Sequence, residues 1–358
     1  GGFTTPWGPG VVRDLPILGH GGVPLALANG SVTTVVLNVT VTQPTAASHL
    51  TIWPKGYARP TTSSVNMKAG QTVANLVTVR VGAGTVGPIS IFNNAGNVHV
   101  IADVVGYYSN SDWGTRFTPS TPTRLIDTRT DVGLTGPLVA GAARTKVVAG
   151  QAGVAADATA VVLNLTAVNS TLDSHITVWP TGSTKPEASN LNFPGSTVVP
   201  NLVIAKLGTN GSMNLATNSG TVDVLADVVG WFSDSCCPAR FTPLVPTRVF
   251  DSRNGQGGAG GALAAGAVRS AAIGGTAGIP VDAKAVVANV TVTGPTATSH
   301  LTVYPAGEGL PVASNLNYSA GQTVPNAVMV KLGTGGRLSI RNNSGTAHVI
   351  VDVVGYLR

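Results

Sequence analysis

The stretch Ala285–Tyr356 contains four segments, AVVANVTVT, SHLTVYP, SNLNYSAGQTVPNAVMVKLG and HVIVDVVGY, that recur twice earlier in the chain. The second copy reads AVVLNLTAV, SHITVWP, SNLNFPGSTVVPNLVIAKLG and DVLADVVGW, and the first reads TVVLNVTVT, SHLTIWP, SVNMKAGQTVANLVTVRVG and HVIADVVGY. Equivalent residues recur about every 125 positions, and a repeat of this length corresponds to a whole domain. The sequence therefore predicts three domains, at residues 1–112, 113–236 and 237–358.

Within each copy, apolar residues alternate with polar ones, which is the pattern of a β-strand. In TVVLNVTVT, Leu37 and Val39 share one face, and Asn38 and Thr40 share the other. Short turns containing Pro-Thr or Ser-Thr connect the first two segments, as in a hairpin with one apolar and one polar face. We therefore expect an all-β fold of three tandem antiparallel β-sandwiches, of the jelly-roll or immunoglobulin-like type, held by short linkers in a semi-rigid rod.

The composition favours an exported β-protein and argues against a nucleic-acid partner. Only 10% of the residues are charged, and strand and turn formers dominate. The net charge is +6, but the basic residues are scattered and form no stripe for nucleic acid. The sequence has no apolar run of about 20 residues that could span a membrane, and we expect Gly1 to be a mature or trimmed end. We expect a secreted protein, extracellular or at the cell surface.

Two similar segments precede the second and third copies. They read RFTPSTPTRLIDTR (Arg116–Arg129) and RFTPLVPTRVFDSR (Arg240–Arg253), and we call them the leading segments; the first copy has none. We expect their guanidinium groups to hold carboxylates in structural ion pairs where domain edges meet. The residues concerned are Arg124, Asp127, Arg129, Arg248, Asp251 and Arg253. The alternative, an acid–base pair or a calcium site, is less favoured because the first copy lacks the segment.

One aspartate recurs inside the last apolar segment of each copy, at Asp103, Asp227 and Asp352. The neighbouring residues are Val, Ile, Ala and Leu. We expect a carboxylate in such a run to be buried and to have a partner.

The combination of RLxDTR, SHLTVYP, SNLNY, GQTVPN and HVIADVVGY resembles a tandem module of secreted proteins from actinomycete bacteria. In those proteins the module is often attached to hydrolases or other extracellular domains. The resemblance covers essentially the whole chain, and the first copy departs from it by lacking RLxDTR. It implies an extracellular, all-β and non-catalytic protein, with no assigned activity to carry over.

Each copy also places an aromatic residue four positions after a histidine on the polar face of a segment. An aromatic ring beside His, Thr and Asn is typical of a platform for sugars, but we favour the alternative, a ring that covers the end of the sandwich. The candidate glycan contacts are His49, Trp53, His175, Trp179, His300 and Tyr304. The three histidines lie in separate copies without nearby Cys or Glu, so we expect no metal site and no cofactor.

Cys236 and Cys237 are the only cysteines, and they are adjacent. Two thiols seldom stay free in an oxidising compartment. We therefore expect a disulfide between these neighbours, or alternatively a bond to another chain.

The sequence contains none of the motifs GxSxG, HExxH, CxxC, P-loop or dinucleotide fingerprint, so we do not expect an enzyme. We expect a structural or assembly protein that associates with itself end to end into a surface fibre, because the first copy lacks a leading segment and would expose a strand edge. The alternative is a module that binds polysaccharide or cell wall and accompanies a secreted hydrolase.

Overall fold

The computed structural model describes residues 4–27, 30–110, 114–234 and 239–358, which form antiparallel strands in six small sheets. The helical segments of these residues are two short 3-10 turns, η1 (Thr209–Gly211) and η2 (Thr334–Gly336). The prediction of an all-β protein is therefore confirmed. The three copies, called repeats 1, 2 and 3 from here on, contribute two sheets each.

Each repeat has a first sheet and a second sheet, and the strand orders correspond, except that the second sheets of repeats 2 and 3 have an additional edge strand. In repeat 1 the sheets are β1 (Val12–Leu15), β6 (Ile89–Asn93), β3 (Ser48–Pro54) and β4 (Val65–Met67), then β5 (Val73–Arg80), β2 (Val32–Thr42) and β7 (His99–Ser109). In repeat 2 they are β10 (Arg144–Val147), β15 (Ser212–Thr217), β12 (Ser174–Pro180) and β13 (Leu191–Phe193), then β14 (Val199–Lys206), β11 (Ala160–Val168), β16 (Thr221–Ser233) and β8 (Arg116–Asp127), with β9 (Leu138–Val139) also paired to β16. In repeat 3 they are β18 (Val268–Ala272), β23 (Arg337–Asn342), β20 (Ser299–Pro305) and β21 (Leu316–Tyr318), then β22 (Val324–Lys331), β19 (Ala285–Thr293), β24 (His348–Leu357) and β17 (Phe241–Asp251).

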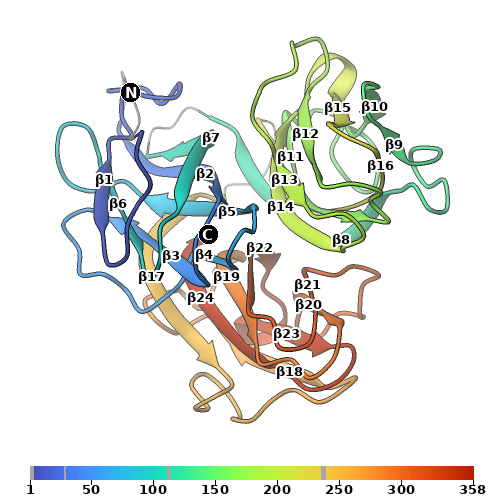
Figure 1. The fold of residues 1–358 in the computed structure, drawn as a ribbon. Helices are drawn as coiled ribbons and strands as arrows, with labels where there is room; N and C mark the ends of the chain where they lie inside the picture. Colours follow the sequence, from blue (N-terminus) through green and yellow to red (C-terminus); the bar gives the residue numbers. More distant parts are fainter. Residues whose placement is uncertain (1–3, 28–29, 111–113, 235–238) are drawn as a thin grey trace.

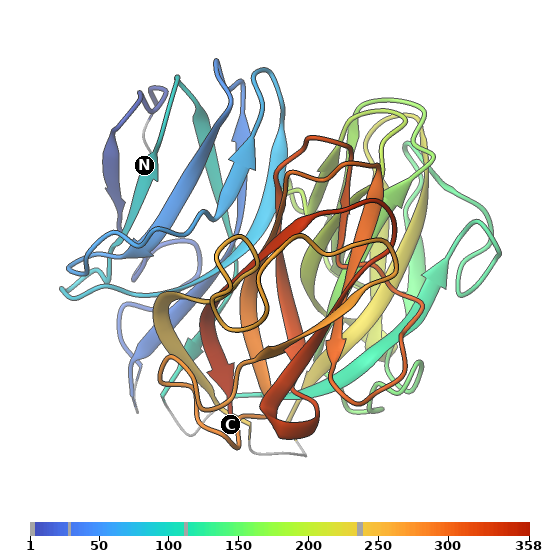
Figure 2. The same ribbon diagram turned by 90° about the horizontal axis from the view of Figure 1, so that it is seen from below.

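One edge strand of every sheet lies at the centre of the molecule. These strands contact one another in a closed circle, in the order β4, β5, β13, β14, β21, β22 and back to β4. The sheets extend outward from this circle, which is the arrangement of a six-bladed β-propeller. Figures 1 and 2 show the three repeats around a common centre, in blue to cyan, green to yellow, and orange to red.

The prediction of three β-sandwiches in a rod was therefore wrong. The error came from the polar face of the segment TVVLNVTVT, which we expected to meet solvent. Asn38 is only 2% exposed and Thr40 only 4%, because neighbouring repeats cover that face. Alternation along a strand shows that its two faces differ, but it does not show that the more polar face is exposed to solvent.

Apolar side chains form four clusters. Three of them lie within one repeat each, between its two sheets. The fourth is central and takes side chains from all three repeats, including Val36, Leu76, Val162, Leu202, Val287 and Met329. Fully burying a valine or leucine side chain contributes about 1.5–3 kcal/mol. This shared cluster therefore makes the association of the three repeats part of the folded core.

Candidate functional site

A ring of six buried asparagines surrounds the centre of the propeller. Each repeat supplies two, and they are Asn38, Asn75, Asn164, Asn201, Asn289 and Asn326. Two hydrogen bonds between their side chains cross from one repeat to another: Asn75 Nδ2 donates to Asn289 Oδ1 at 3.0 Å, and Asn201 Nδ2 donates to Asn38 Oδ1 at 3.1 Å. A buried amide left without partners costs about 1–3 kcal/mol, so these bonds fix how the repeats are placed.

Backbone groups of neighbouring repeats complete the asparagine ring. Asn38 Nδ2 donates to the carbonyl of Ser189 at 2.6 Å, and Asn289 Nδ2 donates to the carbonyl of Ser63 at 2.6 Å. Asn164 Nδ2 makes the equivalent bond to the carbonyl of Ser314. These three asparagines therefore bond from the second sheet of their own repeat to another repeat, at the loop that precedes the innermost strand of its first sheet.

A pocket of about 770 Å³ lies at one end of the asparagine ring. Ala74, Pro200 and Pro325 line it, and each is followed in the chain by an asparagine of the ring. The turns from β4 to β5, from β13 to β14 and from β21 to β22 surround it, so all three repeats build it. We call it the axial pocket. Its volume is within the range of about 300–1,000 Å³ that is common for small-ligand sites.

The lining of the axial pocket combines polar side chains with valines and prolines, and it is nearly uncharged. Its side chains include Lys68, Gln71, Thr197, His300, Asn317 and Gln322. No Asp or Glu of the described residues lines it. Burial, with a smaller effect from the charge of Arg341, lowers the pKa of His300, so this imidazole is neutral near pH 7. Amides and hydroxyls of this kind both donate and accept hydrogen bonds.

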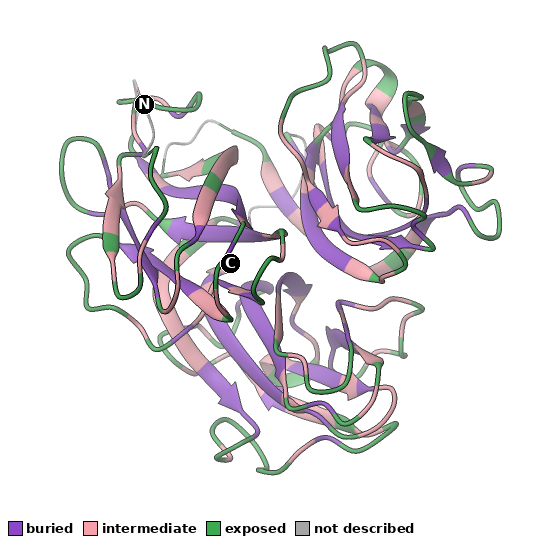
Figure 3. Ribbon diagram, in the orientation of Figure 1, coloured by how far each residue is buried: buried purple, intermediate pink, exposed green. Residues whose placement is uncertain are grey.

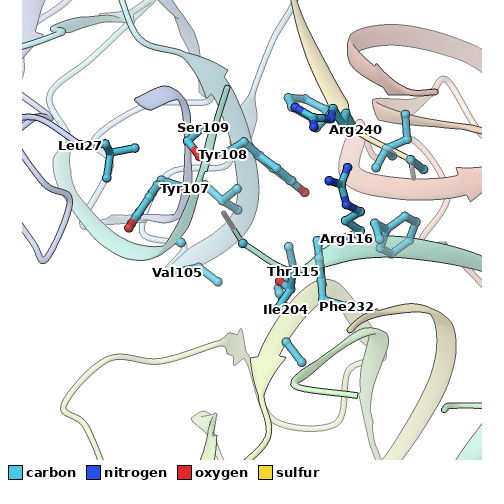
Figure 4. Close-up of a pocket in the computed structure, with 18 residues that line it drawn as sticks. Leu27, Val105, Tyr107, Tyr108, Ser109, Thr115, Arg116, Ile204, Phe232 and Arg240 are labelled. Atoms are coloured by element: carbon cyan, nitrogen blue, oxygen red, sulfur yellow. The ribbon is translucent and has the colours of Figure 1, made fainter. Parts of the chain in front are cut away.

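A second, more apolar cavity of about 480 Å³ is also lined by residues of all three repeats, among them Val36, Ile204 and Phe241. Figure 4 shows Leu27, Val105 and Tyr107 on one side of it and Arg116 and Arg240 on the other.

The ring of Tyr108 also borders this cavity and stacks on Phe241, with centroids 4.3 Å apart. The Tyr108 hydroxyl is buried, which raises its pKa, and it has no hydrogen-bond partner among the described residues.

The structure does not present the predicted sugar platforms to solvent. Trp53 and Trp179 are each only 6% exposed, and Tyr304 only 5%. Trp53 Nε1 donates to the carbonyl of Tyr57 at 3.0 Å. With their faces covered, these rings cannot stack on a sugar without a rearrangement.

The three histidines are half-buried, and burial lowers the pKa of each. Among the described residues around the axial pocket, the lining includes His300 but not His49 or His175. The structure therefore brings one of the six candidate glycan contacts to a pocket and leaves the other five elsewhere.

The charged residues of the leading segments lie together in two clusters. In repeat 2, Arg124 Nε lies 2.5 Å from Asp227 Oδ1 and Arg124 Nη1 lies 2.7 Å from Asp127 Oδ2. Arg129 Nη2 also lies 2.7 Å from Asp127 Oδ2, and this hydrogen-bonded guanidinium lowers the pKa of Asp127. The pair of Arg124 with Asp227 joins β8 to β16, whereas Asp127 is paired within its own leading segment.

Repeat 3 has the same arrangement. Arg248 Nε lies 2.8 Å from Asp352 Oδ1, and Arg253 Nη2 lies 2.7 Å from Asp251 Oδ2. Burial raises the pKa of Asp352 and of its equivalent Asp227, against the opposing effect of their arginines. We expected partners for these two aspartates from the sequence but did not connect them with the arginines of the leading segments. The aspartates and the leading segments nevertheless recur together in the same two repeats.

Two expectations concern metals and cysteines. Within the described ranges, no group of three or more His, Cys, Asp or Glu side chains could hold a metal ion. Cys236 and Cys237 lie outside the described residues.

None of the helical segments in the described ranges has both the length and the apolar character needed to cross a membrane.

Comparison with known proteins yields weak similarities. No protein-family model matches the chain, and no curated protein matches it. One similar solved structure is the N-terminal CBM22-1–CBM22-2 tandem domain of Xyn10C from Paenibacillus barcinonensis, with 12% identity, a TM-score of 0.20, and coverage of 67% of this chain and 100% of that one. Another is a chain of the Sulfolobus turreted icosahedral virus, with 12% identity, a TM-score of 0.20, and coverage of 99% of this chain and 84% of that one. Similarities at this level carry no argument about function.

Proposed function

We propose that the protein is a non-catalytic binding module whose axial pocket takes an uncharged, hydroxyl-rich ligand, such as part of an extracellular polysaccharide. The observation that carries the proposal is the lining of the axial pocket, which sets amide and hydroxyl groups, one lysine and a neutral histidine among valines and prolines. Sugars offer many hydroxyls that donate and accept as well as apolar C–H faces, and such a lining matches both.

The absence of acidic groups supports the non-catalytic part of the proposal. Most enzymes that cleave glycosidic bonds place two carboxylates on either side of the bond. The described residues that line the axial pocket include neither Asp nor Glu. The low charge of the whole chain also supports the expected secreted or cell-surface location.

The test is a glycan array and a polysaccharide pull-down with the full chain. Val198 lies in the pocket lining and is exposed, so Val198→Trp fills the pocket without disturbing a core. The matched control is Val147→Trp, because Val147 is equally exposed on β10 at the outer edge of its sheet. We expect Val198→Trp to abolish retention and Val147→Trp to keep it. Equal retention by both variants would refute the axial site.

A fibre made from the ends of a rod is not retained, since the repeats form a closed ring.

A further inference from the structure

The three turns around the axial pocket, at residues 67–74, 193–200 and 318–325, share one backbone geometry. Their equivalent residues Gly70, Ser196 and Gly321 all have positive φ, and the backbone N–H groups of these residues donate to the carbonyls of Pro44, Ser170 and Pro295. In Figure 3 the strands around the centre are largely buried, in purple, and the loops that connect them are exposed, in green. Since the backbones match, the turns differ in what their side chains offer to the pocket.

The turns of repeats 1 and 3 each hold a glutamine amide in a fixed orientation. Gln71 Oε1 accepts from the backbone N–H of Lys68 at 3.0 Å, and Gln322 Oε1 accepts from that of Ser319 at 2.9 Å. A backbone N–H needs an acceptor, so the oxygen of each amide occupies this position and not the nitrogen. Among the described residues, neither Nε2 has a hydrogen-bond partner. Two amide nitrogens, with two N–H donors each, are therefore left for a ligand in the pocket that both glutamines line.

The turn of repeat 2 replaces both members of this hydrogen-bonded pair. Pro194 takes the place of Lys68 and Ser319, and a proline has no N–H to hold an amide oxygen. Thr197 takes the place of the glutamines, and its hydroxyl donates to the carbonyl of Pro194 at 2.6 Å. Repeat 2 therefore offers no glutamine donor to the pocket.

The next position of the repeat 2 turn is apolar as well. In the other two repeats this position holds Thr72 and Thr323, whose hydroxyls bond to those of Thr42 and Thr293, at 2.9 Å in both cases. In repeat 2 it holds Val198, which lines the pocket and is 49% exposed. The axial pocket is therefore asymmetric, with N–H donors from repeats 1 and 3 and methyl groups from repeat 2.

We propose that the axial pocket receives the acetyl group of an acetylated sugar, a preference that rests on the proposed function. The carbonyl oxygen of an acetyl group accepts hydrogen bonds and its methyl group is apolar, so this one group matches both the glutamine donors and Val198. A hydroxyl or a carboxylate also accepts from N–H groups, but neither has a methyl group to pack against Val198.

The probes are the hexamer of N-acetylglucosamine and cellohexaose, titrated separately into the full chain by calorimetry. The two share a backbone, and an acetamido group replaces one hydroxyl on each ring of the first. We expect the acetylated hexamer to bind about tenfold more tightly or better. O-Acetylated xylan, before and after removal of its esters, provides a second series. A preference for the acetylated form in either series supports the proposal and distinguishes an amide from an ester, whereas equal affinities in both series would overturn it.

Glutamine variants test the donors. Gln71→Glu and Gln322→Glu keep an oxygen for the backbone N–H but replace each pair of N–H donors by a second acceptor. The matched control is Gln151→Glu, which adds the same charge at an exposed residue outside the pocket. We expect each pocket variant to weaken binding of the acetylated hexamer about tenfold or more and the control to leave it unchanged. Unchanged binding by both pocket variants would contradict the proposal.

A valine variant tests the apolar side. Val198→Thr gives repeat 2 the residue of the other two turns and replaces one methyl group by a hydroxyl of similar size. We expect the affinity for the acetylated hexamer to fall about three- to fourfold and that for cellohexaose to stay the same. Val147→Thr is the control, because Val147 is similarly exposed on β10, outside the pocket. An equal loss for both hexamers would show that Val198 does not contact the acetyl group.

The same titrations separate this inference from the proposed function. If the two hexamers bind equally and Val198→Trp abolishes both, the glycan site stands and its preference for acetyl groups is wrong. If neither hexamer nor xylan binds and the glycan array shows no ligand, the proposed function is wrong and the inference falls with it.

Discussion

Asn75 of repeat 1 donates a hydrogen bond from Nδ2 to Oδ1 of Asn289 in repeat 3, at 3.0 Å and across 214 residues of sequence. The Oδ1 of Asn75 in turn accepts from the backbone N–H of Ala327 at 2.9 Å. Both side chains are buried. The first and last repeats are therefore joined directly, which closes the ring of blades and builds the axial pocket.

Asn75→Ala is expected to lower the free energy of unfolding by about 1–3 kcal/mol, since it leaves the buried amide oxygen of Asn289 and the buried N–H of Ala327 without partners. Urea denaturation measures the change. The control is Asn218→Ala, because Asn218 is exposed and its side chain bonds to the adjacent Ser219. Equal stability of the two variants would show that the asparagine ring does not hold the repeats together.

Arg248→Ala should destabilise the protein at pH 7 by about 3–5 kcal/mol, because it leaves Asp352 buried without its cation. Arg358→Ala is the comparison, since Arg358 and Asp282 form an exposed pair that contributes about 0–1 kcal/mol. Thermal or urea unfolding of the two variants tests this. A loss for Arg248→Ala no larger than that for Arg358→Ala would contradict the structural role of the pair.

Asp251 and Asp103 should affect the pH dependence of stability with opposite signs. The hydrogen bond from Arg253 lowers the pKa of Asp251 in the folded protein. Its stabilisation is therefore present above the unfolded-state pKa of about 3.9 and is lost as the pH falls through the lower folded value. Asp251→Asn should cost stability at pH 7 and cost little in strong acid.

Burial raises the pKa of Asp103, so its ionisation destabilises the fold as the pH rises through that value. Asp103→Asn should therefore stabilise the free protein at pH 7, and the gain should vanish below the unfolded-state pKa. Unfolding curves of both variants at neutral and acidic pH test these signs. A destabilised Asp103→Asn protein at pH 7 would indicate that the carboxylate already has a favourable partner.

A pair of glycine substitutions tests the difference between β7 and β24. Gly355→Ala forces a Cβ against the ring of Phe241 and should cost about 1–3 kcal/mol through overpacking. Gly106→Ala should leave the free energy of unfolding almost unchanged. If the two variants lose the same stability, the space over Gly106 is not open in solution.

The strands and the threefold repetition could be predicted from the sequence, because alternation and recurrence are local signals. The closed ring of repeats could not be predicted, because a residue such as Asn38 is interpreted as solvent-facing when only its own strand is considered. Its partners, such as Asn201, are in another repeat. A covered ring of Trp53 was the favoured alternative, although the sequence did not show which residues cover it.

The axial pocket is not visible in the sequence, since its lining comes from turns in three repeats that only the closed ring brings together. Gln71 and Gln322 occupy equivalent turns but lie about 250 residues apart, and no local pattern assigns them to one surface.

Small-angle X-ray scattering of the full chain tests the closed ring most directly. A compact arrangement of 358 residues predicts a radius of gyration of about 21 Å, whereas three domains of this size placed in line give about 30 Å or more. We expect the lower value at all concentrations of the monomer. A monomer with the higher value would contradict the ring, and with it the asparagine ring and the axial pocket.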